Sequence, residues 1–98
     1  MTKYDKYLLR RIYHLLRHHK DAFIFQNMRF REGWCDTEFI CINIKGNDTP
    51  ILTLIHECLH YMYNRWTESV VIKKEKSMYY QLNIRQVKYL YKLMVNLM

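Results

Sequence analysis

The chain has 98 residues, enough for one domain with one modest core, so residues 1–98 are treated as a single domain. Half of its residues are hydrophobic and only two are glycine and one proline, which excludes a disordered or linker-rich chain. The formal net charge of +7 favours solubility and is compatible with nucleic acid, although no recognition motif for nucleic acid accompanies it.

An amphipathic helix is the first predicted element, over residues 5–19. Its apolar residues recur every three to four positions with arginines between them. Asp5 lies near its start, where the positive end of a helix dipole stabilises a carboxylate. Because this segment is rich in arginine and has no carboxylate beside His14, His18 and His19, we interpret these histidines as surface residues rather than a second metal site.

Two segments with β-favouring side chains follow. Residues 22–30 (AFIFQNMRF) are rich in aromatic residues, and residues 37–44 (TEFICINI) alternate so that three isoleucines share one face. Residues 31–36 (REGWCD), which include Gly33, are interpreted as a turn between them. The pattern predicts a β-hairpin or a small antiparallel sheet.

Three helices are predicted for the second half of the chain. They are residues 50–63, 68–81 and 84–97, with Thr49, Thr67 and Asn83 as N-caps. Pro50 stands at the first position of a helix, where its missing N–H costs nothing. The order of one helix, two strands and three helices predicts an α+β domain.

The chain shows no sign of export or membrane insertion. A transmembrane helix needs about 18 uncharged apolar residues, and no such run is present. The N-terminal sequence MTKYDKYLLRR lacks the apolar core of a signal peptide. The odd number of cysteines, without a CxxC pair, argues against a disulfide framework. We therefore expect a cytoplasmic protein with no membrane partner.

The sequence HECLH, residues 56–60, lies within the first of the three later helices. Residues four apart share one face of a helix, with Cβ atoms about 5–6 Å apart, so His56 and His60 can bind one ion together. A helical projection places Thr53, Glu57 and Asn64 on the same side as the histidines. Cys58 falls on the opposite, apolar side and is assigned to the core.

Histidines at this spacing can also be solvated residues of an ordinary amphipathic helix. The chain is 26% charged, yet there is no Lys or Arg between Pro50 and Asn64, and Glu57 is the only formal charge there. Such a helix is better buried over most of its circumference, with its polar groups gathered at an internal site where each needs a partner. We therefore favour a metal site.

A zinc site explains the spacing of these residues. Two neutral imidazoles bind Zn²⁺ and leave room for one further protein ligand and a water. Zinc lowers the pKa of that water towards about 7. Glu57, beside the first ligand, is placed to take the proton of the water as general base and to return it to the leaving amine.

Two glutamates compete for the place of third ligand. Glu68 follows a short turn and opens the next helix, so the chain can fold back and present it to the metal. Glu75 lies on the same face, roughly 10 Å further along the helix axis. Only one of them can reach the ion, and the other can hydrogen-bond the second nitrogen of a histidine. We favour Glu68 as the ligand.

HECLH followed by NRWTESVVIKKE resembles the gluzincins, and specifically their minimal single-domain members, the minigluzincins. The resemblance covers residues 49–76. It implies zinc-dependent peptide-bond hydrolysis, with Glu57 as general base and the metal held by His56, His60 and Glu68. It also implies a strand whose edge pairs with an extended peptide substrate, a role that residues 37–44 or 22–30 would fill. For the group that stabilises the oxyanion, the candidates are Tyr79, Tyr80 and Arg85, by position only.

Two other functions are weighed against a peptidase acting on peptides or proteins. A SprT-like protease acting near DNA usually takes a third histidine, and no histidine follows His60. A small basic module without enzymatic activity, devoted to protein interaction or associated with nucleic acid, would have only a structural or vestigial metal site. Glu57 separates this module from the enzyme, because a structural site has no need of a carboxylate beside its ligand.

Overall fold

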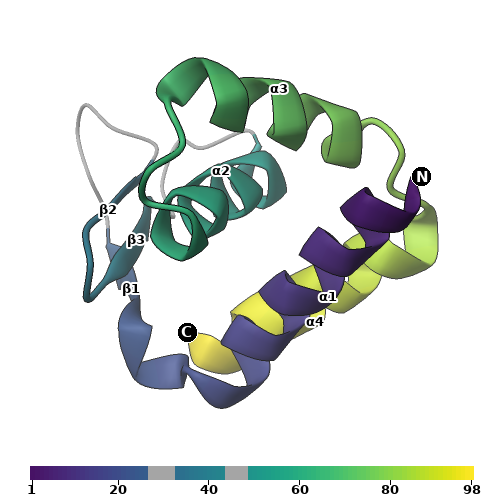
Figure 1. The fold of residues 1–98 in the computed structure, drawn as a ribbon. Helices are drawn as coiled ribbons and strands as arrows, with labels where there is room; N and C mark the ends of the chain where they lie inside the picture. Colours follow the sequence, from purple (N-terminus) through teal and green to yellow (C-terminus); the bar gives the residue numbers. More distant parts are fainter. Residues whose placement is uncertain (27–32, 44–48) are drawn as a thin grey trace.

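The computed structural model describes residues 1–26, 33–43 and 49–98. Its helices are α1 (Lys3–His18), α2 (Pro50–Met62), α3 (Glu68–Tyr79) and α4 (Ile84–Leu97), and its strands are β1 (Phe23–Gln26), β2 (Gly33–Cys35) and β3 (Ile40–Asn43) (Figure 1). A single 3-10 turn, Lys20–Ala22, joins α1 to β1. The predicted α+β class is confirmed, and the four predicted helices lie close to their expected bounds.

The sheet differs in detail from the prediction. Its strand order is β1-β3-β2, with β2 antiparallel to β3 and β1 parallel to it, so the sheet is mixed rather than purely antiparallel. Gly33–Cys35, which we had assigned to a turn, form strand β2. The physical reason is burial: all four residues of β3 are buried, and a strand covered on both faces takes the centre of a sheet. Residues 37–39, predicted as the start of the second strand, lie before β3 and are not part of the sheet, whereas residues 27–32 and Ile44 lie outside the described residues.

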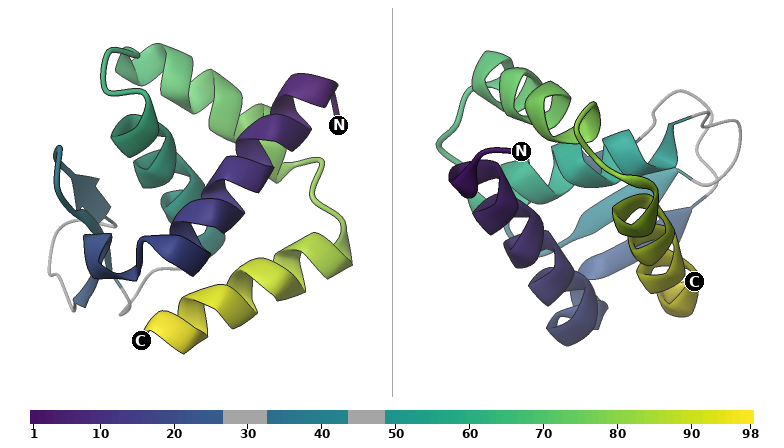
Figure 2. Two further views of the ribbon diagram at one scale, coloured as in Figure 1. Left: turned by 60° about the horizontal axis from the view of Figure 1, so that its bottom comes forward. Right: turned by 90° about the vertical axis from the view of Figure 1, so that its right-hand side faces the viewer.

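Helix α2 passes through the middle of the molecule. It contacts β2 and β3 on one side, and α3 and α4 on others, while α1 packs against α3 and α4 (Figures 1 and 2). Its apolar face is fully enclosed in the core, through Ile51, Leu54, Ile55, Cys58 and Leu59. Because α3 covers much of the opposite face, Thr53 and Glu57 are buried as well. The expectation of a helix enclosed over most of its circumference is confirmed.

A short turn sends the chain back along α2. The N–H of Trp66 donates to the carbonyl of Tyr63, and the hydroxyl of Thr67 then accepts from the N–H of Val70 to cap α3. The turn is stiffened by Tyr63 and Trp66, whose rings stack with centroids 4.3 Å apart. As a result, the first residue of α3 lies beside the last turns of α2.

Two further features complete the frame. Asn83 and Gln86 form a reciprocal capping box that starts α4, as its predicted N-cap requires. Among the described residues, no helix is both long enough and apolar enough to cross a membrane.

Strand β2 approaches α2 very closely at Gly33. A Cβ atom at this position would lie 2.8 Å from the carbonyl oxygen of Cys41 and from Cγ2 of Thr53, and 3.1 Å from Cγ of Glu57. Since carbon atoms at these distances overlap, only glycine lets β2 lie directly over the polar face of α2.

Replacing Gly33 by alanine should therefore destabilise the protein. We expect Gly33→Ala to lower the free energy of unfolding by about 1–3 kcal/mol, the usual cost of overpacking, as measured by urea denaturation. Glu38→Ala, on the exposed segment after β2, is the control and should change stability by less than about 0.5 kcal/mol. An unchanged denaturation midpoint for Gly33→Ala would contradict the close packing of β2 on α2.

Candidate metal centre

His56 and His60 stand one turn apart on α2, at the edge of its buried polar face. Their ring centroids are 4.8 Å apart, and each side chain is 21% exposed, so both are reachable from solvent without being surrounded by it. The helix holds the two rings side by side because both belong to the same regular segment. The pair is therefore positioned before any ion arrives.

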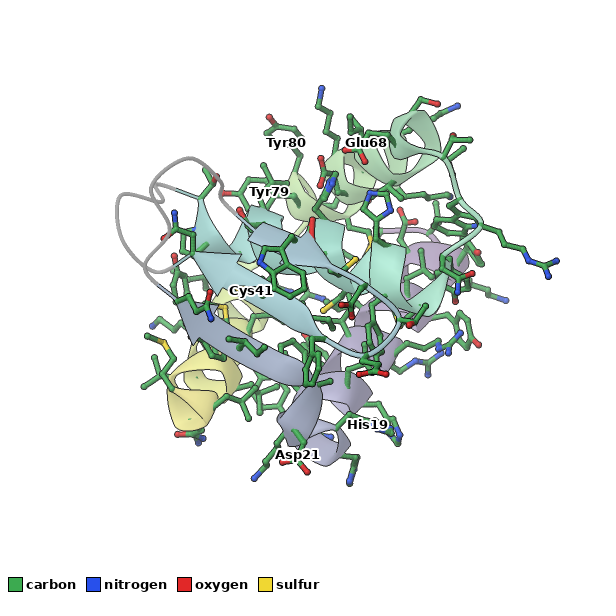
Figure 3. All side chains as sticks on the ribbon, turned by 90° about the vertical axis from the view of Figure 1, so that its left-hand side faces the viewer. His19, Asp21, Cys41, Glu68, Tyr79 and Tyr80 are labelled. Atoms are coloured by element: carbon green, nitrogen blue, oxygen red, sulfur yellow. The ribbon has the colours of Figure 1, made fainter. Side chains whose placement is uncertain are left out.

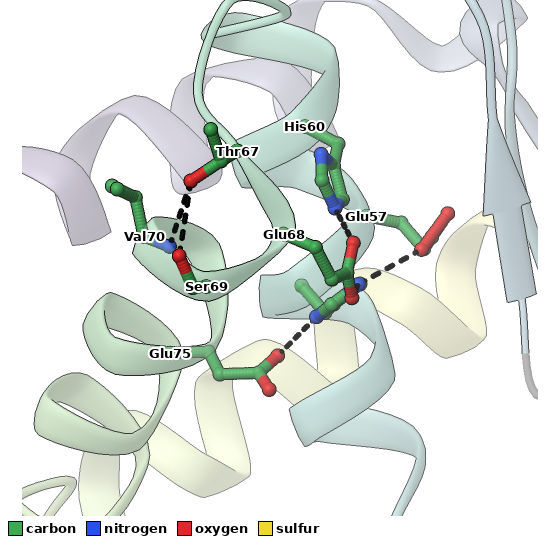
Figure 4. A network of polar contacts seen from close by, with 8 residues as sticks. Glu57, His60, Thr67, Glu68, Ser69, Val70 and Glu75 are labelled. Carbon is green, nitrogen blue, oxygen red and sulfur yellow. Dashed lines mark hydrogen bonds and ion pairs between the residues drawn. The ribbon is translucent and has the colours of Figure 1, made fainter.

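Glu68, the first residue of α3, bridges the two histidines. Its Oε2 lies 2.7 Å from Nε2 of His60, and its Oε1 lies 3.0 Å from Nε2 of His56. One potential donor atom from each of the three residues lies within 4.8 Å of the others. Figure 4 shows the carboxylate of Glu68 reaching from α3 to α2. The structure thus brings together the three residues that the sequence predicts as ligands.

The donor set fits a zinc ion. Zinc bonds of about 2.0–2.2 Å at tetrahedral angles keep donor atoms about 3.3 Å apart. The two carboxylate–imidazole distances, 3.0 and 2.7 Å, belong to different oxygens of Glu68, and one donor atom from each residue lies within 4.8 Å of the others, so side-chain rotations would have to bring one oxygen and both nitrogens to that spacing. Two imidazoles and one carboxylate are also the ligand set of catalytic zinc sites, in which a fourth position is left for water or substrate.

Glu75 has a different relation to the histidines. It is buried, and its Oε2 lies 2.6 Å from Nδ1 of His56, the ring nitrogen that Glu68 does not contact. This hydrogen bond is the main cause that raises the pKa of His56 above its ordinary value of 6.5, against the lowering effect of burial. The charges of Glu75, Glu68 and Glu57 raise it further. Glu75 therefore fits the role of a carboxylate that orients His56, and Glu68 that of a ligand.

Glu57 lies beside the three donors without joining them. It is 7% exposed, and its Oε1 is 3.7 Å from Nε2 of His56. Burial raises the pKa of the Glu57 carboxyl, while the nearby His56 and His60 lower it. A carboxylate that holds a proton more readily than usual, next to a candidate metal, is suited to general acid–base work.

Cys35 is a residue of this site that the sequence analysis did not identify. Its thiol makes a hydrogen bond with Glu57, and burial, followed by the charge of Glu57, raises the pKa of Cys35 to about 12. The thiol therefore stays protonated and donates to the carboxylate. No local pattern could reveal this contact, because it joins β2 to α2 through tertiary packing. Cys58, in contrast, is fully buried in the core, as predicted.

Two adjoining pockets meet at this cluster. One, of about 380 Å³, lies between α2 and α3, with Leu52 and Ile72 on its walls. The other, of about 510 Å³, lies along β2, with Trp34 on its wall. Both are lined by His56, Glu57 and Glu68, so the cluster is open to a ligand from two directions.

The three candidates for an oxyanion group lie elsewhere. Tyr79, Tyr80 and Arg85 are not among the described residues that line either pocket. Tyr79 stands about 16 Å along α3 from Glu68, at 1.5 Å of rise per residue. Figure 3 shows Tyr79 and Tyr80 together, and their rings meet edge to face. We do not assign them to the site.

The remaining histidines form no comparable group. His14, His18 and His19 are all exposed, with the ring centroid of His14 4.6 Å from that of His18 and 5.6 Å from that of His19. Within the described ranges, the one set of three possible metal donors that converge is that of His56, His60 and Glu68.

No protein-family model, no curated protein and no solved structure matches this chain. The fold and the site alone define the class of protein: an α+β domain with a histidine–histidine–glutamate cluster suited to a divalent cation.

The two glutamates of α3 should differ in their effect on metal affinity. We expect Glu75→Ala to weaken zinc binding by about 10–100-fold, as losses of residues that orient a ligand do, and Glu68→Ala to weaken it further, because a donor atom is removed. Competition with a chromophoric chelator measures both. Glu38→Ala is the matched control and should bind zinc like the unmodified protein. A greater loss for Glu75→Ala than for Glu68→Ala would reverse the two roles.

As the pH is lowered, zinc affinity should begin to fall at a higher pH than it does at an ordinary histidine site. The ion must displace a proton from His56, and the raised pKa of His56 extends this competition upward, by at most about tenfold in affinity per pH unit. In Glu75→Gln the main cause of the raised pKa is removed, so its profile of affinity against pH should move to lower pH. Chelator titrations between about pH 6 and pH 8 test this, and superimposable profiles for the two proteins would contradict it.

Proposed function

We propose that this protein is a zinc-dependent peptidase of the minigluzincin type, which hydrolyses peptide bonds in the cytoplasm. The observation that carries the proposal is the bridging of His56 and His60 by Glu68, with Glu57 buried beside them. A structural metal site has no use for this additional carboxylate. A site that activates a water does need such a carboxylate, because a nearby base must accept the proton of the water.

Each residue of the cluster has a defined task in this proposal. His56 and His60 supply imidazole nitrogen to the ion, and Glu68 supplies a carboxylate oxygen. Glu75 accepts the Nδ1 hydrogen of His56 and so fixes the tautomer whose Nε2 is free to bind. A bound zinc would supply a polarised water with a pKa near 7.

Glu57 performs the proton transfers. Its carboxylate accepts a proton from the attacking water and then delivers it to the nitrogen of the leaving amine. The raised pKa of Glu57 favours the protonated form that must exist between these two events. The thiol of Cys35 donates to the same carboxylate and restricts its orientation.

A peptide substrate would lie along β2. The sequence analysis gave this role to residues 37–44 or 22–30, but β3 is paired on both sides and β1 borders neither pocket among the described residues. Strand β2 is at the end of the strand order, and all three of its residues line the second pocket. An extended peptide added to this edge would pass over Glu57, with main-chain hydrogen bonds to hold it.

The decisive variant is Glu57→Gln. It keeps the shape of the side chain but cannot accept a proton, so we expect peptide cleavage to fall by about 10²–10⁴-fold while the zinc content stays at that of the unmodified protein. Cleavage of a fluorogenic peptide library measures the first quantity, and elemental analysis of the purified protein measures the second.

Glu38→Gln is the control, because it makes the same change at an exposed position that lines neither pocket of the cluster. Full activity of Glu57→Gln would refute the role of the base. If the unmodified protein binds zinc but cleaves no member of the library, the enzyme proposal fails as a whole, and a non-enzymatic module with a structural site becomes the better account.

A further inference from the structure

Exposed basic side chains gather on the C-terminal half of α1 and on the two residues that follow it. The exposed basic residues are Arg10, Arg11, His14, Arg17, His18, His19 and Lys20. No aspartate or glutamate occurs between Asp5 and Asp21, and the acidic residues Asp21 and Glu38 line a separate hollow beside Arg17, His18 and Lys20. The apolar residues of the same segment, such as Ile12 and Leu16, are buried in the core, so the basic side chains are displayed by a well-anchored helix.

Four of these residues, Arg10, Arg11, His14 and His19, line a groove between α1 and the end of α2. It has a volume of about 750 Å³ and is formed by Tyr7, Arg10, Arg11, His14, Leu15 and His19 of α1 and its C-cap, together with Met62 of α2. No acidic side chain is among the described residues of its wall. The groove shares no residue with the two pockets of the metal centre, and Figure 3 shows His19 well away from Glu68.

Aromatic rings accompany the positive charges. The guanidinium carbon of Arg11 lies 5.9 Å from the ring centroid of Tyr7 and 5.2 Å from that of Tyr63, and one of its nitrogens donates to the Tyr63 hydroxyl over 2.8 Å. Tyr63 in turn stacks on Trp66. Tyr7 is 45% exposed, so it still offers ring surface to a ligand. Arg11 is thus held at the wall of the groove by its contacts with Tyr7 and Tyr63.

We propose that this groove binds single-stranded nucleic acid. Phosphates would be met by Arg10, Arg11 and the histidines, while bases would stack on the exposed ring of Tyr7. Exposed rings beside a cationic groove are the combination that single strands use. An acidic peptide would exploit the charges and leave the rings without a role, which is why we favour the nucleic acid.

Fluorescence anisotropy with a labelled 12-nucleotide oligo-dT tests the proposal on the full chain. Arg10→Gln with Arg11→Gln should weaken binding and reduce the slope of log affinity against log salt by about 1.4, since each phosphate contact on a single strand contributes about 0.7. Lys88→Gln with Lys92→Gln, exposed on α4, removes the same charge elsewhere and should leave the slope nearly unchanged.

A second pair of variants tests stacking without changing charge. Tyr7→Ala should weaken binding at least about five-fold with no change in the salt slope, whereas Tyr91→Ala, 41% exposed on α4, should have no effect. Equal losses for the two double variants, or no loss for Tyr7→Ala, would overturn the proposal. So would equally tight binding of a labelled 12-residue polyglutamate, because the surface would then be a general anion binder. None of these measurements depends on zinc or on peptidase activity.

Discussion

Everything at the centre of this molecule depends on the contact between Glu68 and the two imidazoles of α2. Three carboxylates, those of Glu57, Glu68 and Glu75, lie around His56, and two of them are buried. Like charges gathered in a poorly solvated place are costly unless a positive charge lies between them. A proton on His56 serves that purpose in part, and its pKa is raised first by the hydrogen bond to Glu75 and then by these charges. A divalent cation held by the same donors would serve it more fully, so the arrangement that retains a proton is also one that favours a metal.

The rest of the fold keeps this contact in place. Helix α3 is fastened to α1 on the side away from the histidines, where the hydroxyl of Ser77 donates to Oδ2 of the buried Asp5 over 2.7 Å. The ammonium of Lys74 stands 3.9 Å from the other oxygen of that carboxylate. Lys74 and Ser77 flank Glu75 in sequence, so the N-terminal helix fixes the axial position of the glutamates. On the opposite wall of the site, Gly33 lets β2 lie against the side chain of Glu57 and so restricts where that side chain can go.

The parts of this arrangement that were predictable are the local ones. The spacing of His56 and His60 is a property of any helix, and the turn before Glu68 is so short that little choice remains for where that residue goes. Glu75 was expected to hold a histidine nitrogen if Glu68 took the metal, and the return of α3 along α2 brings it to His56. The sheet and its contacts were less accessible, because strand order depends on which segment is buried on both faces. For that reason β2 was mistaken for a turn, and the contact between Cys35 and Glu57 was missed.

The distribution of charge connects the two surfaces of the protein. Of nine acidic residues, Glu57 and Glu75 are buried at the candidate metal centre and Asp5 is buried on the inner face of α1, so part of the negative charge is withdrawn from the outer surface. Lys74 lies 3.9 Å from the buried Asp5, whereas seven exposed basic and histidine side chains gather over residues 10–20, a stretch without aspartate or glutamate. The net charge of +7 is therefore not spread evenly. The groove lined by Arg10, Arg11 and His14, beside the exposed ring of Tyr7, is where this uneven charge meets a surface that an anion can enter.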